Sequence, residues 1–95
     1  MVVGICCLEL RISENNSLKG KRRILKSMIE RVTNKFNISM AEVGDHDIWQ
    51  SSQIGFCMVG NDKRFVNSAL DKIIDFIDAM NIAEIIESDI EIINL

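Results

Sequence analysis

The chain of 95 residues contains no proline and no tyrosine, and it has only one histidine, one tryptophan and three cysteines. Three cysteines without framework spacing exclude the paired bridges of a small disulfide-stabilised secreted domain. Adjacent residues of a strand point to opposite faces, so Cys6 and Cys7 cannot easily hold one metal ion together. With a single histidine, a structural zinc site is not expected either. We therefore expect free thiols, no metal and no cofactor.

Long apolar runs are also missing. No stretch approaches the roughly 18 apolar residues of a membrane span, and Met1 leads directly into a strand pattern rather than a signal peptide. A composition of 47% hydrophobic and 26% charged residues is typical of a folded globular protein. We expect a single domain over residues 1–95, located in the cytoplasm and without a membrane partner.

The spacing of apolar residues predicts two helices and four strands. Helical spacing is found in residues 17–36 and 62–80, whereas strands are predicted at 2–12, 38–44, 53–60 and 82–94. The order β-α-β-β-α-β predicts an α+β fold, the ferredoxin-like sandwich. Right-handed crossovers then place both helices on one face of a four-stranded antiparallel sheet, with the first and third strands in the middle.

The same spacing predicts which side chains form the core. Those of the two helices that should be buried against the sheet are Leu25, Ile29, Val32, Val66, Leu70 and Ile73. The short strand 38–44 is ambiguous, because two faces carry apolar residues. Its inward face holds either Ile38 and Met40, or Ala41 and Val43.

The first predicted helix has a basic edge. Four of its cations lie within an arc of about 100° near the helix start, namely Lys19, Arg22, Arg23 and Lys26. The helix macrodipole favours anions at this end, so a bound phosphate would offset the unfavourable placement. With Lys21 they form the predicted anion- or RNA-binding set. The alternative is a solvated charged face with Lys26 and Glu30 paired.

Charge is distributed unevenly along the chain. Residues 1–35 carry a net charge of +5, whereas residues 36–95 carry −8, which gives −3 in total. A uniformly basic nucleic-acid-binding protein is therefore excluded, but a local basic patch on an acidic body is not. The opposite charges could equally serve self-association.

Two sequence motifs resemble those of the YlxP-like family of small uncharacterised bacterial proteins. They are SLKGKRRILKSMIERV, from Ser17, and AEVGDHDIWQ, which includes Glu42, Asp47, Trp49 and Gln50. The resemblance implies a ferredoxin-like fold and no established activity. Some members are encoded beside genes for translation and ribosome assembly, which favours RNA or the ribosome as a partner. The family usually has Glu at the position of Gly20, so this chain lacks half of a capping box after Ser17.

Catalysis is not expected. His46 and Asp47 are neighbours in sequence, which rarely makes an acid–base pair, and no nucleophile or Gly-rich phosphate loop accompanies them. The topology is shared with RNA-recognition domains, which stack bases on aromatic residues of the central strands. The outward positions of residues 2–12 carry no aromatic residue, so that mode of RNA binding is excluded.

Two further surfaces are candidates. Residues Asp47, Trp49 and Gln50 form a predicted loop or partner contact, in which Trp49 either anchors the loop on the sheet or stacks on a base or partner. The sheet face opposite the helices is predicted to gather Val3, Ile5, Cys57, Val59 and Ile93. Such an apolar patch predicts a homodimer, unless the C-terminal residues or a loop cover it. The chain is thus predicted to bind RNA or ribosomal phosphates, or alternatively to be a self-associating module.

Overall fold

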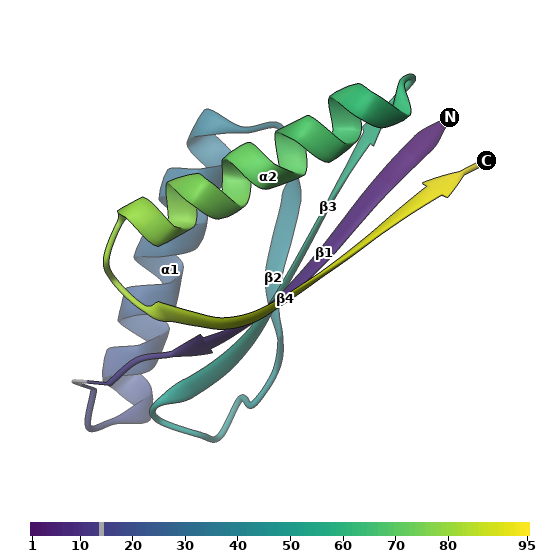
Figure 1. Ribbon diagram of the computed structural model, residues 1–95. Coiled ribbons are helices and arrows are strands. Elements are labelled where there is room, and N and C mark those ends of the chain that lie inside the picture. Colours follow the sequence, from purple (N-terminus) through teal and green to yellow (C-terminus); the bar gives the residue numbers. More distant parts are fainter. Residues whose placement is uncertain (14) are drawn as a thin grey trace.

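The computed structural model describes residues 1–13 and 15–95 and contains the six predicted elements in the predicted order (Figure 1). The helices are α1 (Leu18–Lys35) and α2 (Lys63–Ala79). The strands are β1 (Val2–Arg11), β2 (Ser39–Gly44), β3 (Ser51–Gly60) and β4 (Glu84–Asn94). Each helix begins after the residue that caps it, since Ser17 Oγ accepts from Gly20 N at 2.9 Å and Asp62 Oδ2 accepts from Phe65 N at 3.4 Å.

The four strands form one antiparallel sheet in the order β2-β3-β1-β4. Both helices cover the same face, and the other face carries no helix (Figure 1). This arrangement confirms the predicted ferredoxin-like α+β fold, with the first and third strands in the middle. Helix α1 packs over β2, while α2 crosses β1, β3 and β4. Because Arg11 at the end of β1 pairs with Ser51 at the start of β3, the loop between β2 and β3 lies at the same end of the sheet as the start of α1.

The core lies between the sheet and the helices and is almost entirely apolar. Five of the six predicted helix residues are buried as expected, but Ile29 is only partly buried. Met28 is buried in its place, because the line of α1 that faces the sheet runs through Lys21, Leu25, Met28 and Val32. Ile29 is turned toward β2 and lines a groove there.

The structure resolves the ambiguity of β2. Ile38 and Met40 pack against the core, whereas Ala41 and Val43 are exposed on the opposite face. Glu42 shares the inward face with Met40, as alternation along a strand requires. It therefore points a carboxylate under α1.

Glycine allows α2 to approach the sheet closely at the other end of the molecule. A Cβ atom on Gly4 would lie 2.5 Å from Val66 Cγ1, and one on Gly60 would lie 2.7 Å from Val66 Cγ2. Any larger residue would push α2 away from β1 and β3. This contact is formed by apolar atoms alone.

Candidate functional site

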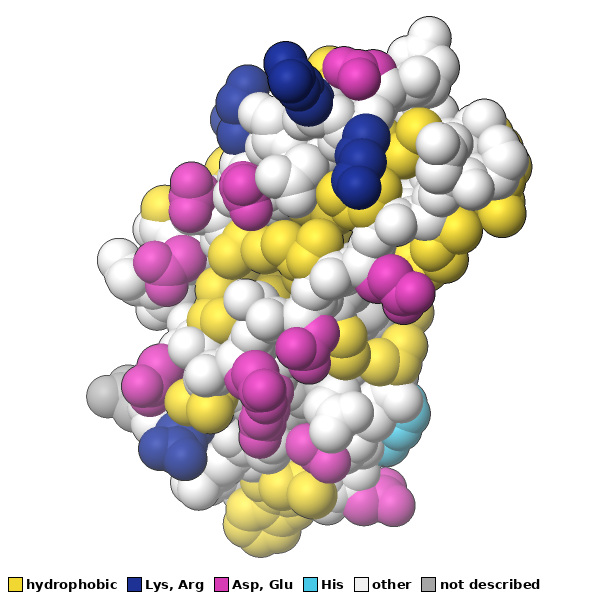
Figure 2. Space-filling model, turned by 45° about the vertical axis from the view of Figure 1, so that its right-hand side comes forward, with side chains coloured by type: hydrophobic (Ala, Val, Ile, Leu, Met, Phe, Trp, Pro, Cys, Tyr) yellow, Lys and Arg dark blue, Asp and Glu magenta, His cyan; other side chains and the backbone are white. Residues whose placement is uncertain are grey.

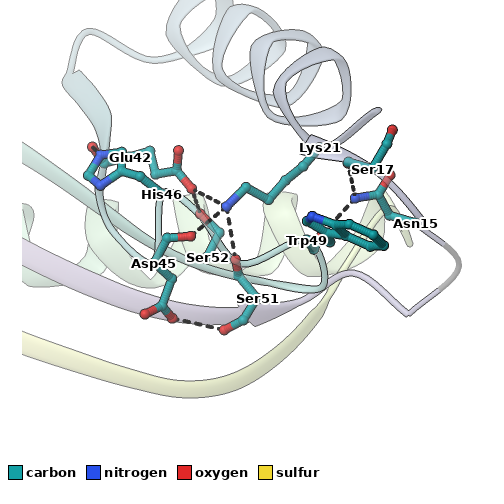
Figure 3. A network of polar contacts seen from close by, with 9 residues as sticks. All are labelled: Asn15, Ser17, Lys21, Glu42, Asp45, His46, Trp49, Ser51 and Ser52. Carbon is teal, nitrogen blue, oxygen red and sulfur yellow. Dashed lines mark hydrogen bonds and ion pairs between the residues drawn. The ribbon is translucent and has the colours of Figure 1, made fainter. Parts of the chain in front are cut away.

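A buried lysine ties α1 to the loop between β2 and β3 (Figure 3). The Lys21 side chain is completely buried, and its Nζ lies 3.0 Å from Glu42 Oε2. It also donates to the carbonyl oxygens of Asp45 at 2.6 Å and Ser51 at 3.2 Å. An ammonium group has three protons to donate, and here each has an acceptor. Lys21 is therefore removed from the predicted anion-binding set, since its ammonium is not accessible to a phosphate.

Two serine hydroxyls bind the residues that contact this lysine. Ser52 Oγ donates to Glu42 Oε2 at 2.7 Å, and Ser51 Oγ donates to Asp45 Oδ2 at 2.9 Å. Asp45 has a φ of 59°, which turns its carbonyl toward Lys21. We call Lys21, Glu42, Asp45, Ser51 and Ser52 the lysine clamp. The sequence carries a signal for this site, because Lys21 lies four residues before Leu25 and so falls on the core-facing line of the helix.

An asparagine forms a second tie between the same two segments. Asn15 is 7% exposed, and its Nδ2 donates to Ser17 O at 2.7 Å and to Trp49 O at 2.6 Å. Gln50 Nε2 donates to Asn15 O at 3.2 Å. A Cβ at residue 20 would lie 2.4 Å from Asn15 Oδ1, so Gly20 provides the room for this side chain. A Glu side chain at position 20 would displace the Asn15 side chain, so the contact of Asn15 fits the presence of Gly at this position.

Trp49 is exposed beside the start of α1. The side chain lies next to Asn15 and Ser17 in Figure 3, yet 52% of the residue remains accessible. Ile48 is 51% exposed, and Asp47 and Gln50 are exposed as well. Both interpretations of Trp49, as an anchor of the loop on the sheet and as a stacking or partner contact, stay predictions. His46 lies 3.3 Å from the carbonyl oxygen of Glu42.

The four other cations of the predicted anion-binding set are all exposed. These are Lys19, Arg22, Arg23 and Lys26, which we call the basic edge. Within residues 1–13 and 15–95 the Lys21–Glu42 pair is the only ion pair within 4.0 Å, so the expected pair of Lys26 with Glu30 is not formed. The first turn of α1 contains no acidic residue. A groove of about 300 Å³ runs along the basic edge between α1 and β2, lined by Arg22, Leu25, Lys26, Ile29, Glu30 and Glu42.

The open face of the sheet brings together the five residues of the predicted apolar patch. In the register of the strands, Val3 pairs with Val59 and with Ile93, and Ile5 pairs with Cys57. Val59 is 63% exposed and Ile5 is 37% exposed, so the described C-terminal residues and loops leave the patch uncovered. A shallow depression of about 360 Å³ continues it toward β2, lined mainly by Ile5, Cys7, Ala41, Val43, Gly55 and Cys57.

Acidic side chains border this apolar surface (Figure 2). Strand β4 is an edge of the sheet and pairs only with β1. Its Glu87, Asp89 and Glu91 are exposed and occupy alternate positions on the open face. The molecule thus has its basic edge beside β2 and an acidic border at β4, on the two opposite edges of the sheet.

The chemistry of the remaining reactive groups is limited. Burial, and to a lesser extent the neighbouring Cys7, Asp89 and Asp71, raises the pKa of the Cys6 thiol to about 11. This thiol is therefore protonated and unreactive at neutral pH. In the part of the chain that the structure describes, no three His, Cys, Asp or Glu side chains come together as a metal site. Neither helix has a stretch long and apolar enough to cross a membrane.

Comparisons with known proteins agree with the resemblance seen in the sequence. The chain is 36% identical over 78 residues to a Bacillus subtilis (strain 168) protein named "Uncharacterized protein YlxP", covering 82% of this chain and 85% of that one. The de novo designed protein Foldit4 has the same fold, with a TM-score of 0.58 at 13% identity, over 100% of this chain and 99% of that chain. The model of a family described as "Protein of unknown function (DUF503)" matches residues 3–90. The chain therefore belongs to the DUF503 family, and the YlxP protein is a relative of this chain.

Proposed function

We propose that this protein binds RNA, free or within the ribosome, through phosphate groups held by the basic edge of α1. The observation that carries this proposal is the exposure of four cations, Lys19, Arg22, Arg23 and Lys26, with no carboxylate within 4.0 Å among the described residues. Phosphate contacts by Lys and Arg supply most of the affinity of sequence-independent nucleic-acid binding.

The location of these cations strengthens the argument. They repel one another, and the helix macrodipole disfavours a positive charge in the first turn, where Lys19 lies, by about 0.3–1 kcal/mol. The Lys21 ammonium, on the same helix, forms an ion pair with Glu42 inside the protein. The four others are left to solvent, where an anion would relieve their repulsion.

The structure gives no comparable support to catalysis. The Cys6 thiol is neutral, Lys21 is fully hydrogen-bonded, and His46 contacts a backbone carbonyl rather than a carboxylate. A nucleophile needs an adjacent base or a lowered pKa. We therefore propose a binding protein rather than an enzyme.

The proposal is tested by titrating a fluorescently labelled single-stranded RNA and following anisotropy. Four phosphate contacts give a log–log salt slope near −3, so affinity should fall roughly 60-fold between 50 and 200 mM salt. Changing Arg22 and Arg23 to Ala should abolish most of the binding. The matched control changes Lys63 and Arg64, two exposed cations at the start of α2, to Ala. Equal losses in the two double variants, or no binding at low salt, would overturn the proposal.

The open face of the sheet supports a second function, self-association as a homodimer. Four strands of six to eleven residues, about 4.8 Å apart, present roughly 600 Å². Two such faces would bury roughly 1,200 Å², the lower end of specific interfaces. The apolar depression and the exposed Ile5 and Val59 favour a second copy of the chain as the occupant, since a two-fold axis pairs the patch with itself.

Sedimentation distinguishes this second function. The wild-type protein should sediment as a dimer at about 100 μM, a concentration above the Kd of most specific pairs. Ile5→Lys should sediment as a monomer, and its circular dichroism spectrum should show that the chain is still folded. Phe65→Lys, which alters an apolar residue on α2 that is more exposed than Ile5, should remain dimeric. A monomeric wild-type protein would exclude the homodimer.

A further inference from the structure

Trp49 is an unusual residue to leave in solvent. Burying a tryptophan removes a large apolar area from water and stabilises a fold, so an exposed indole forgoes that gain. Here 52% of the residue is exposed, in a chain that has no other tryptophan. Exposed indoles of this kind serve as contact surfaces, because their flat face can stack on another ring.

The main chain around Trp49 is held firmly, so this exposure is not that of a loose loop. On one side, Ile48 N donates to Asp45 O at 3.1 Å. The Trp49 carbonyl accepts from Asn15 Nδ2 at 2.6 Å, and the Gln50 carbonyl accepts from Ile12 N at 2.9 Å. The loop ends at Ser51, whose carbonyl accepts from Lys21 Nζ. A ring presented by a fixed backbone loses little entropy when it binds.

The same contacts place Trp49 beside the basic edge. The Asn15 side chain joins the carbonyl of Trp49 to that of Ser17, the residue that caps α1. Lys19 follows two residues later, and Arg22 lies one turn further, on the side of α1 that faces β2. The loop continues directly from β2. The exposed Trp49 side chain and Lys19, the first cation of the basic edge, therefore both lie near the start of α1.

We infer that Trp49 stacks on an unpaired base of the bound RNA, so that this surface selects single-stranded over double-stranded RNA. The inference rests on the proposed function and adds the class of ligand. Aromatic stacking combined with a cationic track is the usual means of holding single-stranded nucleic acid. In an A-form duplex the bases are stacked on one another, and the narrow major groove excludes side chains.

Intrinsic fluorescence tests the inference directly, because Trp49 is the only source of tryptophan emission. Three ligands are titrated at low salt: a single-stranded RNA, the same RNA annealed to its complement, and inorganic polyphosphate. We expect the single strand to quench the emission. Polyphosphate, which has charge but no bases, should bind with no comparable quenching. The duplex should bind more weakly than the single strand.

Two variants complete the experiment. Trp49→Ala should weaken single-stranded RNA binding roughly 10- to 100-fold, the range that follows from one lost stacking contact. The variant should bind polyphosphate like the wild type, and circular dichroism should show the same fold. Trp49→Phe keeps a ring and should retain most of the affinity. Phe65→Ala, which removes an exposed ring on α2, serves as the control.

Failure of the inference and failure of the proposed function give different results. Binding of both RNA and polyphosphate without quenching, or with unchanged affinity in Trp49→Ala, would overturn stacking and leave phosphate binding in place. Equal affinity for single and double strands would overturn the selection. If neither RNA nor polyphosphate binds, the proposed function fails, and the inference fails with it.

Discussion

The two ends of the helix–sheet interface are held together by different kinds of contact. At the loop end, α1 is joined to the segment between β2 and β3 by the lysine clamp and by Asn15, both polar and buried. At the terminal end, α2 rests on β1 and β3 through Val66, with only Gly4 and Gly60 beneath it. One end thus depends on directed hydrogen bonds, and the other on close apolar packing.

The difference shows what each kind of contact can do. Apolar packing stabilises the fold in proportion to the area buried, but it fixes no particular orientation. Buried charges and hydrogen bonds add little net stability, since desolvation offsets them, yet they require one geometry. The residues that we propose to contact RNA lie at the polar end. Their positions are therefore set by contacts that the apolar core could not provide.

The largest effect is expected from breaking the lysine clamp. Lys21→Ala leaves the Glu42 carboxylate without its cation and should lower the free energy of unfolding by about 3–5 kcal/mol. Lys26→Ala removes an exposed cation of the same helix and should cost less than about 0.5 kcal/mol. Urea denaturation measures both. Similar losses in the two variants would show that the clamp contributes nothing beyond a surface charge.

Truncation at the apolar end should cost stability without moving the loop. Leu70 of α2 is completely buried, and Leu70→Ala should lower the free energy of unfolding by about 3 kcal/mol. Under native conditions the emission maximum of Trp49 should stay unchanged, because the contacts of the loop are intact. A shifted maximum in the folded variant would mean that the two ends are coupled. Lys72→Ala, on the exposed side of α2, is the control.

Alkaline pH should weaken the apolar core through Cys6. Folding raises the pKa of this thiol from 9.0 to about 11, mainly by burial. Between these values the unfolded chain loses a proton that the folded chain retains, so stability falls as pH rises from 9 to 11. The loss attributable to this thiol should approach about 2–3 kcal/mol. Denaturation of Cys6→Ala over the same range should show a shallower fall, and parallel curves would contradict the assignment.

The smallest effect is expected from Asn15. Asn15→Ala removes the bridge from Trp49 to the helix cap and should cost about 1–2 kcal/mol. Its clearer consequence is mobility, so the fluorescence anisotropy of Trp49 should fall. Asn16, the exposed neighbour, supplies the control substitution to Ala. Unchanged anisotropy in Asn15→Ala would show that the loop is held by the lysine clamp alone.

The apolar contacts were predictable from the sequence, and most of the polar contacts were not. A period of two or of 3.6 residues follows directly from strand and helix geometry, so the elements and five of six helix core residues could be predicted. Ile29 was assigned one position off the buried line, which Met28 occupies. The apolar patch on the open face was also predictable, because strand order and alternation decide which residues share a face.

The polar contacts depend on partners far apart in the chain. Charge alone places Lys21 in the predicted anion-binding set with its neighbours, although its spacing from Leu25 places it on the core-facing line of α1. Nothing near it in sequence indicates that Glu42 and two loop carbonyls would satisfy its ammonium. Asn15 gave no signal in a polar loop, and only the room left by Gly20 lets it reach Trp49. A charge or an amide carries no period from which its direction could be predicted.

Strand β4 has a consequence for how the protein behaves at high concentration. It is an edge strand of eleven residues rich in isoleucine, and among residues 1–13 and 15–95 no strand pairs with its outer backbone groups. Such an edge can template further β-pairing between molecules. The repulsion between the exposed Glu87, Asp89 and Glu91 of neighbouring copies opposes this pairing. Replacing these three residues with Gln or Asn should therefore allow fibrils that bind thioflavin, which the wild-type protein should not form, so colloidal stability depends on the charge of a single strand.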